Sequence, residues 1–233
     1  MSGTLYGVGL GPGDPELITL KAARLIENAT TIAYPTLAGG DSFARAIAAG
    51  LIREGTREIR MDVPMSTERQ PAQSAYDTGA AEIAKVLEAG NDVVCLCEGD
   101  PFFYGSFMYL HARLTAAFDI QIIPGVTSVT ACAARAAMPL AARNERLTIL
   151  PGPLPEDELR TRIDGAESVV IMKVGRHLAK IRAVIDDLGI TDQAMYVERA
   201  TLPEELVLPL SQAPEQAPYF SIILLTKGAD PWL

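Results

Sequence analysis

Hydrophobic positions in the first half of the chain alternate between two patterns. Short apolar runs typical of buried strands occupy residues 5–10, 31–34, 58–63, 92–97 and 120–123. Apolar residues at helical spacing predict helices between them, over about 14–29, 42–52, 71–89 and 101–114. Strands that alternate with helices through short links form a parallel sheet covered on both faces. We therefore predict an α/β domain over residues 1–123, with a mostly parallel five-stranded sheet.

Three prolines mark expected ends of these elements. Asp14-Pro15 and Asp100-Pro101 each place a capping aspartate before a proline that suits the first turn of a helix. They predict helix starts at Pro15 and Pro101. Pro35 is expected to end the second strand.

The second half begins at Pro124-Gly125 and has a different order of patterns. An alanine-rich helix is expected over 127–137, followed by further helices near 156–163 and 178–188. Strands are expected at 147–150, 169–173, 194–198, 206–210 and 220–226. Because no helix separates the last two strands, we predict that they pair antiparallel. Residues 124–233 should form a second α/β domain with a mixed sheet.

The run from Gly7 to Gly13 is rich in glycine and lies between a strand and a helix. This is where a dinucleotide-binding fingerprint is credible, because glycines let the backbone approach a phosphate. However, Pro12 removes one amide donor, and Asp14 places a negative charge where a pyrophosphate would lie. The second strand also lacks an acidic residue for a ribose hydroxyl. A tight strand-to-helix turn is the better interpretation.

Charge and hydropathy exclude several classes of protein. The net charge of −9 disfavours non-specific binding to nucleic acid, which needs clustered Lys and Arg. No apolar run approaches the roughly 20 residues that span a bilayer. The first residues, Met-Ser-Gly-Thr, do not resemble a signal peptide. We expect a cytoplasmic protein without a nucleic-acid or membrane partner.

The three cysteines favour a structural role. Cys95 and Cys97 alternate along an apolar run and should point to one face of a strand. Cys132 stands alone, and neither histidine of the chain, His111 or His177, is near a cysteine in sequence. We predict buried, reduced cysteines and no protein-bound metal.

Three motifs carry a family resemblance. Val8–Thr19 reads VGLGPGDPELIT, Glu98–Ser106 reads EGDPFFYGS, and PGVTS at Pro124–Ser128 is followed by Thr130-Ala131. In this order and spacing they resemble the signatures of the tetrapyrrole (corrin and porphyrin) methyltransferases. The resemblance covers essentially the whole chain. It implies two α/β domains with S-adenosylmethionine in the cleft between them, and a homodimer.

A narrower likeness concerns the substrate. Glu98 stands before Gly-Asp-Pro where many members have glycine or serine. Segments 63–65, 172–176, 196–201 and 218–221 resemble the precorrin-2 C20-methyltransferases of cobalamin biosynthesis. That branch methylates C20 of precorrin-2 or its cobalt-containing counterpart (cobalt-precorrin-2 or cobalt-factor II), giving precorrin-3A and S-adenosylhomocysteine.

Rival functions stay open at this point. They are methylation of another tetrapyrrole position (in uroporphyrinogen III or precorrin-4), of an RNA ribose or of the diphthamide precursor, and non-catalytic carriage of a tetrapyrrole.

The resemblance also assigns cofactor contacts, each with a purely structural alternative. Asp100 and Pro101 could simply begin a helix, and Tyr104 could line the site or the core. The second-half positions are otherwise ordinary core residues. The residues implied to contact the cofactor are Gly99, Asp100, Pro101, Tyr104, Thr130, Ala131, Met172, Ala200 and Ser221.

The substrate is a polycarboxylate, so its site needs local cations. The loop Gly11-Pro12-Gly13-Asp14 is expected to face the flat macrocycle, together with Arg176. Candidate cations in the second half are Arg143, Arg146, Lys173, Arg176, His177 and Arg199, each of which could equally be a solvated surface charge. Reaction at C20 requires alignment rather than a protein nucleophile. Glu98 or Asp14 could accept the C20 proton, but the sequence identifies no catalytic base.

Overall fold

The structure is a computed structural model that describes residues 2–37, 40–64 and 69–228. Met65, the last residue of the segment 63–65 named above, lies outside these ranges. The chain forms two compact units, Met1–Thr127 and Ser128–Leu233. The placement of a cofactor between two domains divided at residue 123 stays a prediction.

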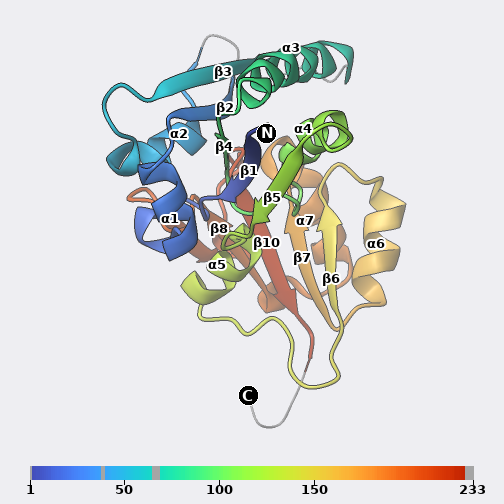
Figure 1. Cartoon of the computed structure of the whole chain (residues 1–233). Coiled ribbons are helices and arrows are strands. Elements are labelled where there is room, and N and C mark those ends of the chain that lie inside the picture. Colours follow the sequence, from blue (N-terminus) through green and yellow to red (C-terminus); the bar gives the residue numbers. More distant parts are fainter. Residues whose placement is uncertain (1, 38–39, 65–68, 229–233) are drawn as a thin grey trace. The chain divides into compact units, whose positions relative to one another are not determined.

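The first unit contains the predicted parallel sheet (Figure 1). Its five strands are all parallel, in the order β3-β2-β4-β1-β5. The strands are β1 Thr4–Gly9, β2 Thr31–Leu37, β3 Arg57–Val63, β4 Val93–Cys97 and β5 Asp119–Ile123. This sheet confirms the α/β class predicted for the first half. In this order β1 has β4 and β5 as its neighbours, so the loops that follow these three strands leave the sheet side by side.

Helices cover both faces of this sheet (Figure 1). α1 (Leu20–Glu27) and α2 (Phe43–Ala48) pack on one face, where Val94 and Leu96 of β4 point. α3 (Arg69–Glu88) and α4 (Phe107–Leu114) pack on the other. Cys95 and Cys97 both belong to that second face, which confirms the alternation read from the sequence. Every side chain of β4 is buried, as expected for a strand covered on both faces.

Two predicted helix starts are wrong. Asp14 caps only a single 3-10 turn, Pro15–Leu17, and the α-helix begins at Leu20 with Thr19 as its cap. After Pro101 the chain makes turns, and α4 begins at Phe107. In both places an aspartate and a proline start a local turn, but the next residues do not continue the helical bonding.

The predicted strand end at Pro35 is also wrong. Pro35 lies inside β2, where it pairs with Met61 of β3. On its other side, β2 pairs with β4 only at Ile32 and Ala33. Because β2 does not pair with β4 at Pro35, the missing N–H of this proline removes no hydrogen bond between these two strands.

The second unit has a mixed sheet in the order β6-β7-β10-β8-β9. Its strands are β6 Leu147–Pro151, β7 Ser168–Met172, β8 Ala194–Glu198, β9 Leu206–Pro209 and β10 Ser221–Thr226. β6 and β7 are parallel, and the other neighbours are antiparallel. The mixed sheet was predicted, but the pairing of the last two strands was wrong. β10 lies between β7 and β8, because its four central apolar residues, 222–225, fit the buried centre and leave the more exposed β9 at the edge.

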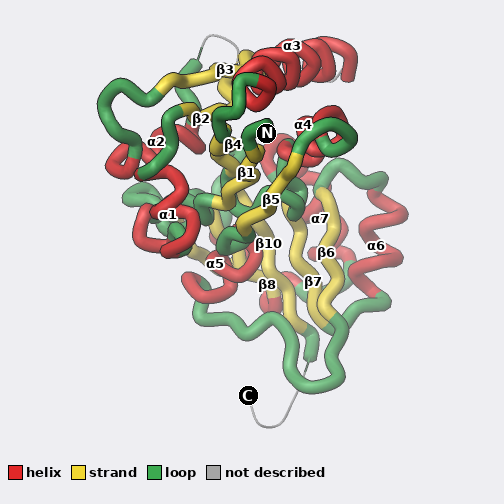
Figure 2. Tube along the Cα trace, viewed as in Figure 1, coloured by secondary structure: helices red, strands yellow, loops and turns green. Residues whose placement is uncertain are grey.

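Three helices flank this sheet (Figure 2). α6 (Glu156–Asp164) and α7 (Leu178–Asp187) pack on one face, against side chains such as Ile171, Tyr196 and Ile223. α5 (Ser128–Arg135) packs against β10. The predicted cofactor residues of this unit lie in the first half of α5, at the ends of β7 and β8 and at the start of β10.

Candidate functional site

Three loops leave the first sheet at the edge where β4, β1 and β5 end. Because the strands are parallel neighbours, these loops emerge side by side. The loop after β1 is bonded to the loop after β4. The N–H of Leu10 donates to the carbonyl of Cys97 at 2.9 Å, and Gly11 and Gly99 exchange backbone bonds of 3.2 and 2.8 Å. Two of the three sequence motifs are thus joined through their main chains.

Glycines bring the third motif into the same place. A β-carbon on Gly125 would lie 2.1 Å from the carbonyl oxygen of Gly99, and one on Gly9 would lie 2.5 Å from the nitrogen of Gly125. Neither position can hold a side chain without moving the backbone of another loop. The three motifs are therefore packed main chain against main chain. The sequence did not single out Gly9 or Gly125 for this contact, because it lies between residues distant along the chain.

Asp100 fastens two of these loops. Its Oδ1 accepts hydrogen bonds from the N–H groups of Phe102, at 2.9 Å, and Phe103, at 3.1 Å. Its Oδ2 accepts from the N–H of Gly125 at 3.1 Å. Asp100 thus caps the turn that follows β4 and holds the loop that follows β5. These bonds support the structural interpretation of Asp100 and leave its cofactor contact a prediction.

Glu98 begins the same loop and has an unusual environment for a carboxylate. Part of its side chain reaches solvent, yet the protein packed around the carboxyl group removes water and raises the pKa of Glu98. A hydrogen bond with the backbone of Ala44, at the start of α2, has the opposite and weaker effect. Glu98 therefore holds its proton more firmly than an ordinary glutamate.

The other predicted residues of the first unit have turn geometry. Gly11 and Gly99 have φ values of 79° and 63°, a region that favours glycine. Tyr104 adopts φ 55° without being glycine, and its side chain is exposed and meets Phe103 edge-on. Asp14 accepts a 2.8 Å bond from the N–H of Glu16. The structure brings Gly11 and Gly99 together, and the ligand contacts of these residues stay predictions.

In the second unit, the ends of β7 and β8 lie on the two sides of β10. Both strands run antiparallel to β10, so both end at the edge where β10 begins. Lys173 follows β7 and Arg199 follows β8, each exposed and in the left-handed region, with φ of 57° and 49°. Such a backbone in a residue other than glycine carries strain, which is found at functional sites more often than elsewhere. This edge is the counterpart of the three-loop edge in the first unit.

Ser221 begins β10 at this edge, and its hydroxyl is used by the protein. The Oγ atom donates to the carbonyl of Pro218 at 2.7 Å and accepts from the N–H of Gly175 at 3.3 Å. The residue is buried. Its side chain therefore ties the loop after β7 to the segment before β10, and a cofactor contact would have to use its backbone.

The remaining predicted cofactor residues of this unit differ in exposure. Ala131, Met172 and Ala200 are buried, whereas Thr130 on α5 is exposed. Ala131 lies in the middle of α5, and Ala200 lies in the loop between β8 and β9. The burial of Ala131, Met172 and Ala200 agrees with the core interpretation, whereas the exposure of Thr130 shows that this interpretation is wrong for that residue. The cofactor contacts of all four stay predictions.

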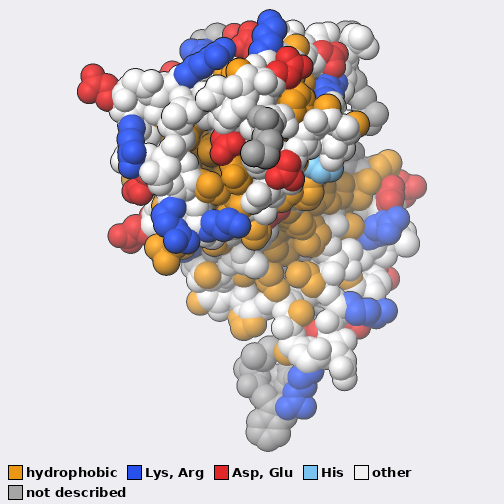
Figure 3. All heavy atoms as spheres, viewed as in Figure 1, with side chains coloured by type: hydrophobic (Ala, Val, Ile, Leu, Met, Phe, Trp, Pro, Cys, Tyr) orange, Lys and Arg blue, Asp and Glu red, His pale blue; other side chains and the backbone are white. Residues whose placement is uncertain are grey.

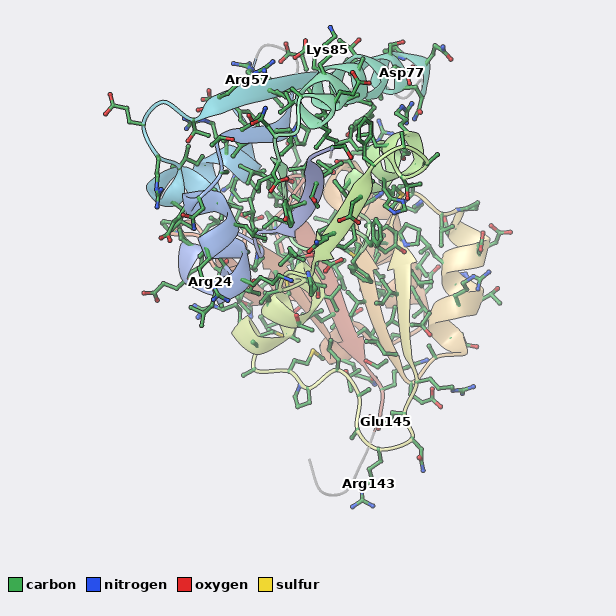
Figure 4. All side chains as sticks on the ribbon, viewed as in Figure 1. Arg24, Arg57, Asp77, Lys85, Arg143 and Glu145 are labelled. Carbon is green, nitrogen blue, oxygen red and sulfur yellow. The ribbon has the colours of Figure 1, made fainter. Side chains whose placement is uncertain are left out.

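The candidate cations do not form one cluster. Arg146 precedes β6, at the opposite edge of the sheet from Lys173 and Arg199, and is paired with Glu167 at 2.8 Å. Arg143 lies in the loop before β6 and points outward (Figure 4). Arg176 lies beside His177, whose pKa is lowered by burial and by the nearby charges of Lys180 and Arg176. Of the candidates, Lys173, Arg176 and Arg199 belong to the loops at the edge where β7 and β8 end.

The surface and the cysteines add little chemistry of their own. Positive and negative side chains are interspersed on the face drawn in Figure 3. Within residues 2–37, 40–64 and 69–228, no three His, Cys, Asp or Glu residues form a group that could hold a metal ion. No helix in those ranges has both the length and the apolar character needed to cross a membrane. All three cysteines are buried and free of disulfides.

Comparison with known proteins identifies the family. The family model of the tetrapyrrole (corrin/porphyrin) methylases matches residues 4–214. The chain belongs to this family. The three joined loops of the first unit are therefore the assembled form of the family motifs that the sequence displayed.

Curated relatives of this chain include two that it covers over nearly their whole length and one that it covers over less than half. The precorrin-2 C(20)-methyltransferase of Sinorhizobium is 42% identical, over 98% of this chain and 97% of the relative. The cobalt-precorrin-2 C(20)-methyltransferase of Salmonella typhimurium is 34% identical over 97% and 98%. The cobalamin biosynthesis protein CobIJ of Mycobacterium tuberculosis is 44% identical, but this chain spans only 46% of its length.

Solved structures of tetrapyrrole methylases share the fold. A cobalt precorrin-4 methyltransferase superposes with a TM-score of 0.73 at 24% identity, covering 96% of this chain and 94% of the other. The uroporphyrin-III C-methyltransferase of Thermus thermophilus, complexed with S-adenosylhomocysteine, gives 0.68 at 25% identity and covers 95% and 97%. These likenesses confirm the two-sheet α/β architecture.

Proposed function

We propose that this protein transfers a methyl group from S-adenosylmethionine to C20 of precorrin-2, or of its cobalt-containing counterpart, in cobalamin biosynthesis. From precorrin-2 the product would be precorrin-3A, and from the cobalt-containing substrate the corresponding cobalt-containing methylated macrocycle, with S-adenosylhomocysteine released in either case. The observation that carries the proposal is the 42% identity, across nearly the whole of both chains, to a precorrin-2 C(20)-methyltransferase. The loops joined at the end of the first sheet support it, because they are built from the family's motifs.

The backbone of Gly99 is open on the side where a side chain would stand. A β-carbon on Gly99 would meet nothing nearer than the carbonyl of Val126 at 4.0 Å, so a ligand can approach the backbone there. When bound, S-adenosylmethionine supplies an electrophilic methyl carbon on a sulfonium. In the first unit, Gly99, Asp100, Pro101 and Tyr104 would contact the cofactor.

The cofactor residues proposed in the second unit would act largely through backbone and small size. Their side chains are buried, except that of Thr130. They are Thr130, Ala131, Met172, Ala200 and Ser221. Ser221 would serve by fixing Gly175, since its hydroxyl is already bonded within the protein.

The substrate would be held by a loop and by cations. The loop Gly11-Pro12-Gly13-Asp14 offers little side-chain bulk to a flat macrocycle, and its bond to Gly99 places it beside the proposed cofactor residues of the first unit. Arg176 is proposed to bind a substrate carboxylate. Lys173 and Arg199 belong to the same edge of the second sheet and are further candidates.

The chemistry asks the protein mainly to align its two reactants. C20 of the reduced macrocycle is electron-rich and attacks the methyl carbon directly, so no covalent enzyme intermediate is required. Holding both reactants in line can supply several kcal/mol of the barrier. The proton that leaves C20 needs an acceptor. Glu98, with its raised pKa, and Asp14 are the candidate carboxylates in the first unit.

We also propose that the protein is a cytoplasmic homodimer without a resident metal. Light scattering of the purified protein tests the homodimer, since a monomeric mass would contradict it. Activity on metal-free substrate after treatment with a chelator tests the second.

The decisive test of function is an anaerobic incubation with precorrin-2 and S-adenosylmethionine labelled with ¹³C in its methyl group. Carbon NMR then locates the new methyl. A single label at C20 would support the proposal. Gly50→Ala serves as a matched variant, because a β-carbon there meets no atom within 4 Å. It should retain full activity.

Other outcomes separate the alternatives. A label at another carbon would keep the family and contradict the C20 assignment. If precorrin-2 is not labelled, the same experiment with cobalt-precorrin-2 decides whether the metal is required. Binding of either macrocycle without any methyl transfer would favour a tetrapyrrole carrier.

A further inference from the structure

A buried carboxylate in the second unit joins two segments that carry proposed cofactor residues. Glu205 ends the loop between β8 and β9, and its side chain is only 14% exposed. The loop contains Ala200. Opposite Glu205 is α5, which contains Thr130 and Ala131. No sequence motif singled out Glu205.

The first contact of Glu205 is with its own loop. Its Oε2 accepts a hydrogen bond of 2.6 Å from the N–H of Thr201, the residue next to Ala200. Thr201 has φ 71°, a left-handed conformation that a β-branched residue rarely adopts. Arg199, two residues earlier, is also left-handed. The carboxylate therefore stabilises a backbone that the residues themselves disfavour.

The second contact is with α5. The Nε of Arg135 lies 2.7 and 2.8 Å from the two oxygens of Glu205, and its Nη2 lies 2.7 Å from Oε1. Bidentate pairs of this kind have a defined geometry as well as a charge. Arg135 is four residues after Ala131, so both lie on one side of the helix. The pair therefore fixes the side of α5 that carries Ala131 relative to the loop that carries Ala200.

The pKa of Cys132 also indicates that Glu205 lies close to α5. This buried thiol has a pKa raised to about 12, first by burial and then by the negative charge of Glu205. Glu205 is thus close enough to the helix to affect two of its residues. The carboxylate that precedes this loop, Glu198 at the end of β8, is likewise mostly buried, and it accepts a hydrogen bond from the hydroxyl of Tyr196. The loop from Arg199 to Glu205 is thus tied to α5 at its C-terminal end, by Glu205.

We infer that Glu205 is a positioning residue for S-adenosylmethionine, which holds the Ala200 loop against α5 and so sets the shape of the cofactor site. The inference rests on the proposed function, because Ala200, Thr130 and Ala131 are cofactor residues only within that proposal. Glu205 does not itself touch the cofactor. It acts through the N–H of Thr201 and through Arg135.

The test measures binding of S-adenosylhomocysteine by calorimetry, together with KM for each substrate. Glu205→Ala should raise the dissociation constant and the KM for S-adenosylmethionine about tenfold, since a charged hydrogen-bonded group is lost. The KM for the tetrapyrrole should rise less, about twofold, because Arg199 is the one proposed substrate residue in the loop that Glu205 holds. Glu205→Gln keeps an acceptor for Thr201 and should have a smaller effect, about threefold.

Two further variants keep the test sharp. Glu167→Gln removes a carboxylate from an exposed arginine pair in the same unit and should leave cofactor affinity unchanged. Arg135→Met should weaken cofactor binding as Glu205→Gln does. The double variant Arg135→Met/Glu205→Gln should bind the cofactor no more weakly than the weaker-binding of the two single variants. Additive effects would contradict action through the pair.

Failure of this inference can be told from failure of the proposed function. If the wild-type protein binds S-adenosylhomocysteine and Glu205→Ala and Glu205→Gln, folded by circular dichroism, bind it equally well, the positioning role is wrong. If the variants weaken binding as expected but the wild type does not methylate C20, the positioning role stands and the substrate assignment falls. If the wild type does not bind S-adenosylhomocysteine, both fall.

Discussion

The two units hold their loops in different ways. At the end of the parallel sheet, Gly9, Gly99 and Gly125 let three loops touch through their main chains, and Asp100 adds the side-chain fastening. At the edge of the mixed sheet where β6, β7 and β8 end, one such contact is present, between Gly152 and the carbonyl of Lys173, and the side chains of Ser221 and Glu205 hold the other loops. The left-handed residues there are Lys173, Arg199 and Thr201 rather than glycines, apart from Gly175.

This difference has consequences for substitution. Contacts between main chains leave no space for a β-carbon, so the first unit should tolerate change least at Gly9 and Gly125. Side-chain bonds can be removed without a clash, so changes in the second unit should cost less and act on the geometry of single loops. The following predictions, from the largest effect to the smallest, test this contrast.

The largest effect is expected for Gly125→Ala. The new β-carbon would lie 2.1 Å from the carbonyl of Gly99, and backbone must move to admit it. We expect the free energy of unfolding to fall by about 3 kcal/mol, measured by urea denaturation, with loss of cofactor binding. Gly50→Ala, which meets no atom, should stay within about 1 kcal/mol of the wild type. Equal denaturation midpoints for the two variants would contradict main-chain packing as the constraint.

Asp100→Ala should come next. Three backbone N–H groups, those of Phe102, Phe103 and Gly125, lose their acceptor. We expect stability to fall by about 2 kcal/mol and the affinity for S-adenosylhomocysteine to fall more than that for precorrin-2. Asp100→Asn retains one acceptor oxygen and should lose less. Calorimetry that finds cofactor affinity unchanged in the alanine variant would remove Asp100 from the site.

Ser221→Ala tests the side-chain fastening of the second unit. The N–H of Gly175 loses its acceptor and the carbonyl of Pro218 loses its donor, but no atoms are forced together. Thermal denaturation should show a loss of about 1 kcal/mol. Ser74→Ala, in which the serine is exposed on α3, is the matched control and should be near neutral. A loss in Ser221→Ala as large as that of Gly125→Ala would erase the contrast between the units.

The smallest effect is the pH dependence contributed by Glu98. Its pKa is raised in the folded protein, so the folded state binds more protons than the unfolded state between the two pKa values. The free energy of unfolding should therefore fall as pH rises through that window. Glu98→Gln removes the titration and keeps an acceptor for Ala44. Its stability relative to the wild type should increase from pH 4 to pH 8 in thermal melts, and a constant difference would refute the effect.

Local features of the fold could be predicted from the sequence. Apolar periodicity predicted the five strands of each sheet, because buried faces require it. The capping roles of Asp14 and Asp100 were foreseen, although each starts a turn rather than an α-helix. The motifs at Val8–Thr19, Glu98–Ser106 and Pro124–Ser128 identified the family, because the order and spacing of motifs can be seen in the sequence without the structure.

Only the tertiary structure decided which distant residues meet. β10 lies between β7 and β8 because its apolar run fits the buried centre of the sheet, a choice that adjacency in sequence did not reveal. Glu205 binds Arg135, 70 residues away, and Gly125 touches Gly9 and Gly99. Such contacts have no period and no local signal along the chain. They form when the faces of sheets and helices pack against one another. The residues that hold the proposed site can therefore be identified in the folded structure but not in the sequence.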